Sequence, residues 1–198
     1  MSTPSGHLPA SSIQVHLKKS QTLVLSQSSN HYWMRIKIDR GVVRLFTHQH
    51  AYARENEITL AIMTSDDCGS FKRLQSCDLA VEGISEATFN IVYENRISQE
   101  ESDFLRDWLL DLHLIRNPAR AEDRLFLLLK LLTERFGRRT IEGYTLDFLL
   151  SHSRIAEIIG TTRSTVSRTL GVMKKSNQLV IDELRESLVL RPFDKVDG

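Results

Sequence analysis

Residues 150–170 carry the most specific pattern in the chain and read Leu150-Ser-His-Ser-Arg-Ile-Ala-Glu-Ile-Ile-Gly-Thr-Thr-Arg-Ser-Thr-Val-Ser-Arg-Thr-Leu170. Ser151 can cap a helix through Ile158, because a serine hydroxyl accepts hydrogen bonds from the free amides of a first helical turn. Gly160 supplies a residue that tolerates positive φ in a tight turn. A second helix is predicted over residues 163–175, so the stretch predicts a helix-turn-helix.

The two faces of the second helix differ in polarity. Its inner face is apolar, because Val166, Leu170 and Met173 recur at helical spacing. Ala156 in the first helix is small enough to let the two helices cross closely. The outer face is polar and consists of Arg163, Ser164, Ser167, Arg168, Gly171 and Lys175. Such a face suits entry into the major groove of DNA, whereas an ordinary helical corner that binds nothing is the alternative.

Ten residues are candidates for contact with DNA. Arg168 is predicted to read a base, since arginine pairs bidentately with guanine. Arg163 could read a base or bind a phosphate. Lys174 and Lys175 could bind phosphates or stabilise the helix C-terminus. The full set is Ser151, His152, Thr161, Thr162, Arg163, Ser164, Ser167, Arg168, Lys174 and Lys175.

The flanking segments complete a small DNA-binding unit. Residues 144–149 alternate like a short strand, and residues 178–182 and 187–191 form two further strand-like segments around a charged turn. That pair is the expected wing. The acids at residues 183–186 indicate that the tip of the wing does not itself lie on phosphate.

Residues 13–93 carry short strand-like segments rich in β-branched and aromatic residues, with polar or glycine-containing breaks between them. The segments are residues 21–26, 33–38, 42–47, 58–64 and 88–93. Short strands at this spacing predict a small antiparallel barrel or sandwich. Residues 1–12 are polar and are expected to be a disordered tail.

The pattern becomes helical at Ser98, where Ser98-Gln-Glu-Glu101 has the form of a capping box. Apolar residues then recur at helical spacing over residues 104–115. The helix is therefore expected to begin at the capping box and to end near Arg116.

A second helix is predicted to start directly at Asn117-Pro118, read as an N-cap followed by a proline at the first helical position. It is expected to end at Phe136, with Gly137 as the stop signal. The polar corner near residue 117 is the predicted domain boundary. The expected organisation is a tail (1–12), a β-domain (13–97), a connecting helix with its hinge (98–117) and a DNA-binding domain (118–198).

The net charge of +1 conceals a basic segment and an acidic one. Residues 151–178 hold five Lys or Arg against one acid, and residues 98–111 hold five acids against one base. The start of the chain does not resemble a signal peptide, and no apolar run approaches about 18 residues, which predicts a soluble cytoplasmic protein. Since no phosphate-binding loop, nucleophile elbow or metal-hydrolase motif is found, no catalytic or metal site is expected.

Residues 150–170 resemble the DNA-binding domain of the CRP/FNR family, most of all its cyanobacterial nitrogen-control branch. The resemblance is specific from about residue 119 to 190 and weaker over residues 20–117. It implies an α+β chain with an N-terminal antiparallel β-roll like a cyclic-nucleotide-binding domain, a long dimerisation helix and a C-terminal winged helix-turn-helix. It also implies a homodimer that binds palindromic double-stranded DNA and works with RNA polymerase.

The helix after Ser98 is the dimer interface that this resemblance implies. The candidate interface residues are Phe104, Leu105, Trp108, Leu112 and Ile115. The same apolar face could instead pack beneath the β-roll, and a helix of about 18 residues with wide apolar coverage can do both.

The resemblance carries over part of the family's base-reading set. Arg163 and Arg168 match the arginines that face guanines in the cyclic-AMP receptor branch. Ser164 stands where that branch has a glutamate that accepts from cytosine, a role that serine cannot fill in the same way. Ser167 matches a serine of the oxygen-sensing branch. We therefore expect a related palindrome with a guanine opposite Arg168 and a half-site that differs from those of both branches.

The sensor part departs from the family's cyclic-nucleotide pocket. That pocket needs a Phe-Gly-Glu turn and, later, an Arg followed by Ser or Thr, whereas this chain reads Ser65-Asp-Asp-Cys-Gly-Ser-Phe-Lys-Arg73. Gly69 is the single residue that matches this pattern. The acids Asp66 and Asp67 would repel a phosphate. Cyclic AMP is therefore not expected as a cofactor.

Two pairs of residues in the sensor part have competing interpretations. Lys72 and Arg73 could bind a small dianion such as 2-oxoglutarate, or they could be a solvated basic pair, which is the favoured interpretation. Cys68 and Cys77 could form a redox pair, but two ordinary thiols are favoured because residues 1–30 lack the cysteine cluster of the iron–sulfur branch.

His48 and His50 could ligate a metal or haem, but a solvated hairpin tip is favoured since no further ligand accompanies them at the required spacing. The alternative function for the whole chain is a small-ligand or redox sensor module that acts through a protein partner. In that case the winged helix would be a protein interaction surface, and DNA affinity that depends on salt would be lacking.

Overall fold

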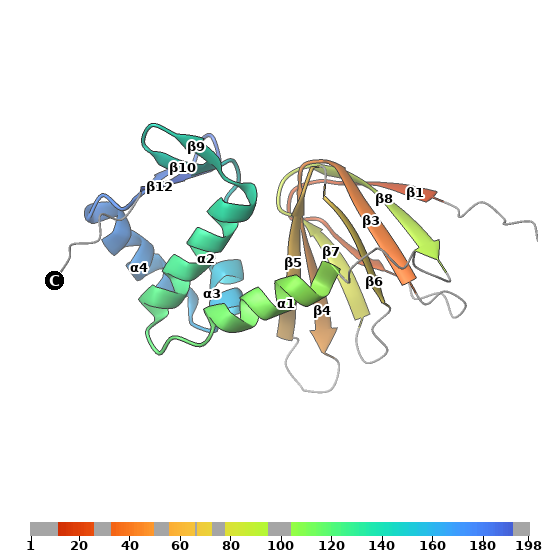
Figure 1. Ribbon diagram of the computed structural model, residues 1–198, viewed down its shortest axis with the longest axis horizontal. Coiled ribbons are helices and arrows are strands. Elements are labelled where there is room, and N and C mark those ends of the chain that lie inside the picture. The colour runs from red at the N-terminus through yellow and green to blue at the C-terminus, as the bar shows by residue number, and fades with distance from the viewer. Residues whose placement is uncertain are drawn as a thin grey trace, which may run out of the picture.

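The computed structural model describes residues 12–25, 33–49, 56–65, 67–72, 78–94 and 104–191. One half of the molecule is built of strands, and the other half of helices and a small sheet (Figure 1). Helix α1 (Phe104–Ile115) lies against the strand half and leads into the other. Within the described ranges, no helix combines the length and apolarity needed to cross a membrane.

Two four-stranded sheets make up the strand half. Their strands are β1 (Ser12–Leu17), β2 (Thr22–Leu25), β3 (Trp33–Arg40), β4 (Val42–Gln49), β5 (Asn56–Thr64), β6 (Cys68–Lys72), β7 (Asp78–Gly83) and β8 (Ala87–Glu94). The sheet orders are β1-β8-β3-β6 and β2-β7-β4-β5, and every neighbouring pair is antiparallel. The predicted antiparallel β-domain is therefore confirmed.

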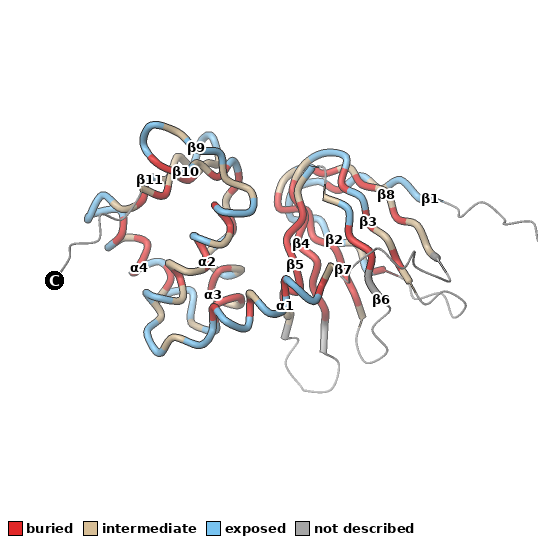
Figure 2. Tube along the Cα trace, viewed as in Figure 1, coloured by how far each residue is buried: buried red, intermediate tan, exposed pale blue. Residues whose placement is uncertain are grey.

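Alternation of apolar and polar residues places the core between the sheets. Met34, Ile36 and Ile38 on β3 are buried, while the residues between them point outward. Phe89 and Ile91 on β8 belong to the same buried cluster. Figure 2 shows the buried positions along the strands of both sheets. The core positions on β3 therefore follow from a period of two, whereas residues 42–47, 59–63 and 79–83 are buried on both faces of their strands.

All five predicted strand segments form strands, but β1, β6 and β7 were not predicted. Strand β7 does not alternate, because residues 79–83 are all buried. Strand β1 is exposed over most of its length, and β6 contains Gly69 and Ser70. Strands β6 and β7 lack the alternating pattern that favours a strand, whereas β1 alternates at Ile13, Val15 and Leu17, so its signal was present in the sequence and was missed.

Helix α1 packs on β5, β6 and the second helix, α2 (Ala121–Phe136). Four of the five residues proposed for a dimer interface are buried inside this chain, namely Leu105, Trp108, Leu112 and Ile115. Phe104 is half-buried and packs against the same core. The core-packing alternative therefore describes these side chains, and the capping box at residues 98–101 lies outside the described residues.

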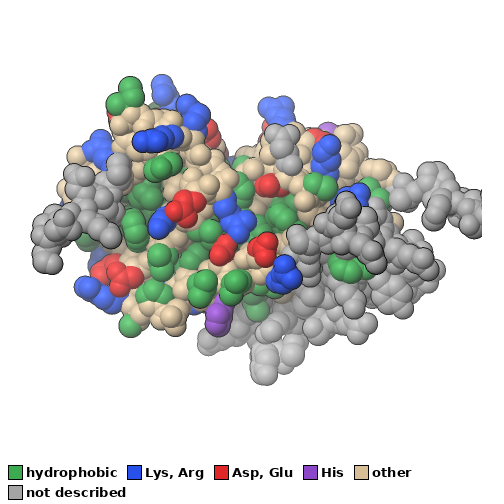
Figure 3. Space-filling view, viewed as in Figure 1, with side chains coloured by type: hydrophobic (Ala, Val, Ile, Leu, Met, Phe, Trp, Pro, Cys, Tyr) green, Lys and Arg blue, Asp and Glu red, His purple; other side chains and the backbone are tan. Residues whose placement is uncertain are grey.

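The opposite face of α1 is exposed, and it carries three leucines beside the polar residues Arg106, Asp107 and His113. Leu109, Leu110 and Leu114 are 44%, 58% and 54% exposed. In Figure 3, hydrophobic side chains gather over α1 on the face toward the viewer. We refer to Leu109, Leu110 and Leu114 together as the exposed face of α1.

Helix α2 begins at Ala121, so the predicted start at Asn117-Pro118 is wrong. The Asn117 amide donates to the Leu114 carbonyl at 3.1 Å, so Asn117 closes the end of α1 and does not cap a new helix. Residues 117–120 bend between the two helices. Arg120 is the N-cap residue without a side-chain bond, and the acids in the first turn complement the helix dipole.

The predicted end of α2 at Phe136 is confirmed. Gly137 follows in an extended conformation and not in the left-handed one. A Cβ atom at this position would lie 2.4 Å from the Thr133 carbonyl oxygen, so close backbone approach is what requires the glycine.

The rest of the helical half consists of α3 (His152–Ile159), α4 (Arg163–Lys175) and a sheet. Its strands are β9 (Arg138–Thr140), β10 (Gly143–Leu146), β11 (Leu179–Asp182) and β12 (Ser187–Leu190), in the order β11-β12-β10-β9. The predicted helix-turn-helix and its wing hairpin, β11–β12, are confirmed. The predicted strand at residues 144–149 is confirmed only as far as Leu146.

We expect Trp108→Ala to lower the free energy of unfolding by about 3–5 kcal/mol, because it empties a filled core site. Trp108 is 1% exposed, and its ring stacks on Phe136 of α2 at a centroid distance of 5.8 Å. Urea denaturation followed by circular dichroism measures the loss. Leu184→Ala, at a wing residue that is 98% exposed, is the control and should change stability by less than about 0.5 kcal/mol. Equal effects of the two substitutions would contradict the packing described above.

Candidate nucleic-acid interface

Helix α3 is fixed at both ends by local signals that the sequence predicts. The Ser151 hydroxyl accepts the Arg154 amide at 3.3 Å, which makes Ser151 the N-cap. Gly160 ends the helix in the left-handed conformation, with φ 64° and ψ 54°. The Thr161 amide then donates to the Ala156 carbonyl at 2.9 Å. The turn between the two helices is therefore set by the backbone itself.

Helix α4 begins after a threonine cap. The Thr162 hydroxyl accepts the Thr165 amide at 3.2 Å, so this candidate for contact with DNA also starts the helix. Val166, Leu170 and Met173 are buried as predicted, and Ala156 faces them at 5% exposure. The inner face of α4 is thus fully used in packing against the rest of the unit.

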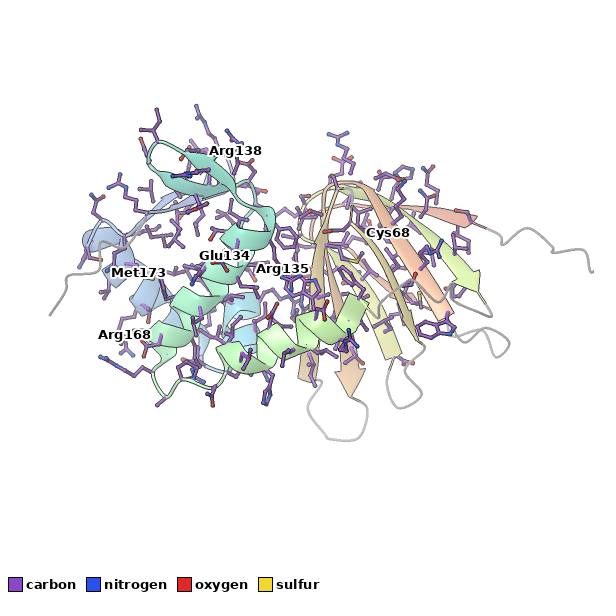
Figure 4. The ribbon with its side chains drawn as sticks, in the orientation of Figure 1. Cys68, Glu134, Arg135, Arg138, Arg168 and Met173 are labelled. Atoms are coloured by element: carbon purple, nitrogen blue, oxygen red, sulfur yellow. The ribbon has the colours of Figure 1, made fainter. Side chains whose placement is uncertain are left out.

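The outer face of α4 is exposed and polar. Its exposed polar side chains are Arg163, Ser164, Ser167, Arg168, Lys174 and Lys175, and Val172, at 60% exposure, is an apolar residue beside them. Figure 4 shows Arg168 at the end of the molecule remote from the β-sheets, whereas Met173 lies between α4 and α2. A row of short polar side chains between cationic ones leaves room for a base edge to approach the helix.

Four candidate residues line one hollow beside α4. It is a cavity of about 510 Å³ between α3, α4 and the wing, and Ser151, His152, Ser167 and Lys174 contribute to its wall. The other six candidates lie on the turn or on α4 and do not line it. The structure therefore brings the N-terminus of α3 and one flank of α4 together, while Arg168 projects from the neighbouring flank.

The cations of α4 differ in their surroundings. Lys174 lies 4.0 Å from Glu183 of the wing. Arg163, Arg168 and Lys175 have no acidic partner within 4.0 Å among the described residues. Their positive charge is therefore directed to solvent and is available for a polyanion.

The acids of the wing are engaged within the chain. Glu186 forms a close ion pair with Lys19 of the β1–β2 turn. The Asp182 carboxylate accepts the amides of Leu184 and Arg185, each at 3.0 Å. These contacts shape the turn of the wing and tie it to the strand half.

Arg154 belongs to the basic segment in the sequence but lies away from its other cations. Its Nη2 atom is 3.0 Å from Glu82 Oε1, and its Nη1 atom forms a close contact with Glu57. Both acids lie in the strand half. The basic surface of this unit therefore excludes Arg154, and the ion pairs that it forms at the junction of the halves were not predicted from the sequence.

Only some of the remaining candidate residues lie in the part of the chain that the structure describes. Asp66, Arg73, Cys77, His50 and the capping box lie outside the described residues. Cys68 is an exposed free thiol on β6 (Figure 4). His48 and Lys72 belong to β4 and β6. In the described part of the chain, no three or more potential ligands gather in a group that could hold a metal ion.

Comparison with known proteins agrees with this architecture. Residues 107–192 match the Crp-like helix-turn-helix domain. The global nitrogen regulator of Synechococcus elongatus is 44% identical over 62 residues, which are 31% of this chain and 28% of that protein. The global nitrogen regulator of a Nostoc species is 43% identical over 58 residues, 29% of this chain and 26% of that protein. The match thus spans little more than a quarter of the length of these relatives.

Solved structures show the same fold over most of the chain. FixK2 from Bradyrhizobium japonicum has a TM-score of 0.67 at 18% identity and covers 92% of this chain and 93% of its own. A CRP-family transcriptional regulator from Thermus thermophilus has a TM-score of 0.62 at 14% identity, with coverages of 90% and 92%.

Residues 107–192 are therefore similar to a Crp-like helix-turn-helix domain, and the chain has the fold of the solved regulators named above, a strand-built domain followed by a winged helix-turn-helix.

We expect Gly160→Ala to destabilise the protein by about 1–2 kcal/mol, because L-residues disfavour the left-handed conformation. The nearest atom to an added Cβ is Arg124 Nη1 at 3.7 Å, so crowding contributes nothing. Gly171→Ala is the matched control and should stabilise by about 0.5–1 kcal/mol, since it lies within α4. An added Cβ at Gly171 meets nothing within 4 Å. Urea denaturation measures both, and shifts of the same sign would contradict the assigned turn.

Proposed function

We propose that this protein is a sequence-specific DNA-binding transcription regulator that binds a palindromic site as a homodimer and does not depend on cyclic AMP. RNA polymerase is the further partner through which such a regulator acts. The observation that carries the proposal is the outer face of α4, where unpaired arginines flank short polar side chains. Arginine on such a helix pairs bidentately with guanine in the major groove, and the nearby helix N-termini suit phosphates.

Two contacts support independence from cyclic AMP. An added Cβ at Gly69 would lie 2.6 Å from Phe104, so this glycine accommodates the ring of α1. The Asp67 carboxylate accepts the Thr64 amide at 2.7 Å and carries negative charge beside the same turn. A glycine used for packing and an acid that repels phosphate argue against a cyclic-nucleotide site here.

The exposed face of α1 supports a homodimer. Leu109, Leu110 and Leu114 form an apolar strip beside a buried face that the chain already uses for its own core. We expect a second copy of the chain to cover these leucines, because a two-fold axis brings the same residues of two copies against each other. Two copies of α4 would then reach successive major grooves about 34 Å apart.

Selection of bound sequences from a random duplex pool, with the full chain and no added ligand, tests the proposal. We expect a two-fold palindrome with half-sites one helical turn apart. Recovery only after addition of 2-oxoglutarate would make a small dianion the effector. Recovery of no sequence under either condition, with no salt-dependent affinity for DNA, would favour a module that acts through a protein partner.

We expect Arg168→Ala to weaken binding to the selected site by about 1–3 kcal/mol and to relax specificity at one base pair. Fluorescence anisotropy on the selected duplex and on its single-base variants measures both effects. Arg138→Ala is the control, since Arg138 lies on the β9–β10 hairpin, away from α4 (Figure 4). An equal loss on all sequences would assign Arg168 to phosphate contact.

We expect Leu114→Glu to shift the protein toward the monomer, because burying a carboxylate in an apolar interface is unfavourable. Sedimentation velocity measures the dissociation constant. Leu184→Glu, at a wing residue that is 98% exposed, is the matched control and should leave the assembly unchanged. A monomeric unmodified protein, or an unchanged dimer in the Leu114→Glu variant, would rule out the exposed face of α1 as the interface.

A further inference from the structure

A fully buried arginine lies in the sheet that faces the helical half. Arg44 on β4 is 0% exposed, and its guanidinium therefore needs charged or polar partners inside the protein. Its Nε atom donates to the Thr59 hydroxyl at 2.7 Å. Its Nη1 atom donates to Glu57 at 2.8 Å and to Glu82 at 2.9 Å. The strand half thus supplies two carboxylates for one buried cation.

The last partner of Arg44 comes from the helix-turn-helix. Arg44 Nη2 donates to Glu157 Oε2 at 3.1 Å, and Glu157 lies on α3. The other oxygen of Glu157 accepts the backbone amide of Thr59 at 2.9 Å. One side chain of α3 therefore satisfies both a buried charge and a backbone amide of the sheet.

The contact is reciprocal, because α3 also brings a cation to the acids of the sheet. Arg154 is three residues before Glu157 and therefore on the same helical face. Its Nε atom is 2.9 Å from Glu82 Oε2, and it also contacts Glu57. Glu157 of α3 thus pairs with Arg44 of the sheet, and Arg154 of α3 pairs with two acids of the sheet. Positive and negative charges therefore alternate across the junction.

Arg116 extends the contact from the end of α1. Its Nε atom donates to the Ile158 carbonyl at 2.7 Å, and its Nη2 atom donates to the Glu157 carbonyl at 2.7 Å. These carbonyls belong to the last turn of α3, where a cation is favourable to the helix dipole. The end of α3 that leads into the Gly160 turn is therefore held as well.

We propose that this cluster, defined as Arg44, Glu57, Glu82, Arg154 and Glu157, positions the recognition helix. Its members fix α3 on the strand half, and the tight turn at Gly160 transmits that orientation to α4. The cluster is the means by which residues far from DNA set the angle and spacing at which two copies of α4 meet the two half-sites. This inference rests on the proposed function.

The physical reason is the cost of separating the two halves. If the two halves separated, Arg44 would lose its hydrogen bond to Glu157. Arg154 would likewise lose its ion pairs with Glu57 and Glu82. Removing one partner of a buried ion pair is strongly unfavourable, because the remaining charge is left without compensation. One orientation of the halves is consequently much preferred while the cluster is complete.

The test compares two double variants of the full chain that leave the net charge unchanged. Arg154→Ala with Glu157→Ala removes the α3 side of the cluster at residues that are partly exposed, at 25% and 19% of the side chain. Lys130→Ala with Glu134→Ala removes an exposed i,i+4 pair on α2 and serves as the matched control. Circular dichroism and thermal unfolding establish that both variants are folded before they are compared.

Residual dipolar couplings of backbone amides measure the orientation directly and without DNA. We expect one alignment tensor to fit both halves of the unmodified protein and of the control, and two different tensors to be needed for the cluster variant. We further expect the cluster variant to bind the selected palindrome at least about 10-fold more weakly, and the control to stay within about twofold. The preference for one half-site spacing should relax in the cluster variant alone.

A single tensor in the cluster variant would overturn the proposal, and so would altered orientation with unchanged DNA affinity and spacing. If the unmodified protein binds no duplex, the proposed function fails and the role in DNA reading fails with it. The tensors would then still decide whether the cluster holds the two halves together, so the two failures are distinguishable.

Discussion

The buried guanidinium of Arg44 is the interaction on which the relation between the two halves depends. A cation inside a sheet is tolerated only when acceptors surround it, and here β5 contributes two of them while β7 and α3 contribute one each. Because the acceptor from α3 belongs to the helix-turn-helix, satisfying the charge also places the reading unit. The need to pair a buried charge in the strand half thereby restricts where the helix-turn-helix can lie.

Helices α1 and α2 are held together by a contact between aromatic rings. Trp108 of α1 stacks on Phe136 of α2, and the Arg135 guanidinium lies 4.4 Å from the centroid of the Trp108 ring. Helix α1 is therefore part of the core of the chain on one face and free on the other. This division explains how a helix of 12 residues can join the halves and still leave Leu109, Leu110 and Leu114 exposed.

The helix-turn-helix could be predicted closely because its signals are local. The Ser151 cap, the left-handed Gly160 and the period of Val166, Leu170 and Met173 each involve residues within a few positions of one another. The five predicted strand segments also carry a local signal, namely β-branched and aromatic residues between polar or glycine-containing breaks. Strand β7 carries that signal only weakly, because Val81 is its one β-branched residue and it has no aromatic residue.

The features that escaped prediction depend on contacts between distant segments. Asn117-Pro118 has the sequence of a helix start, yet the Asn117 amide is already used to close α1. Arg154 reads as part of a basic face until Glu57 and Glu82 are known to lie opposite it. The only sequence signal of the cluster is a charge within an apolar strand, as at Arg44, and such a charge does not reveal its partner.

The structure of the protein bound to its selected duplex would test most directly whether an oriented α4 reads DNA. We predict α4 in the major groove with Arg168 against a guanine in each half-site, and Arg44 still in contact with Glu157. A complex in which α4 lies outside the groove, or in which α3 has left the β-sheet, would contradict this mechanism.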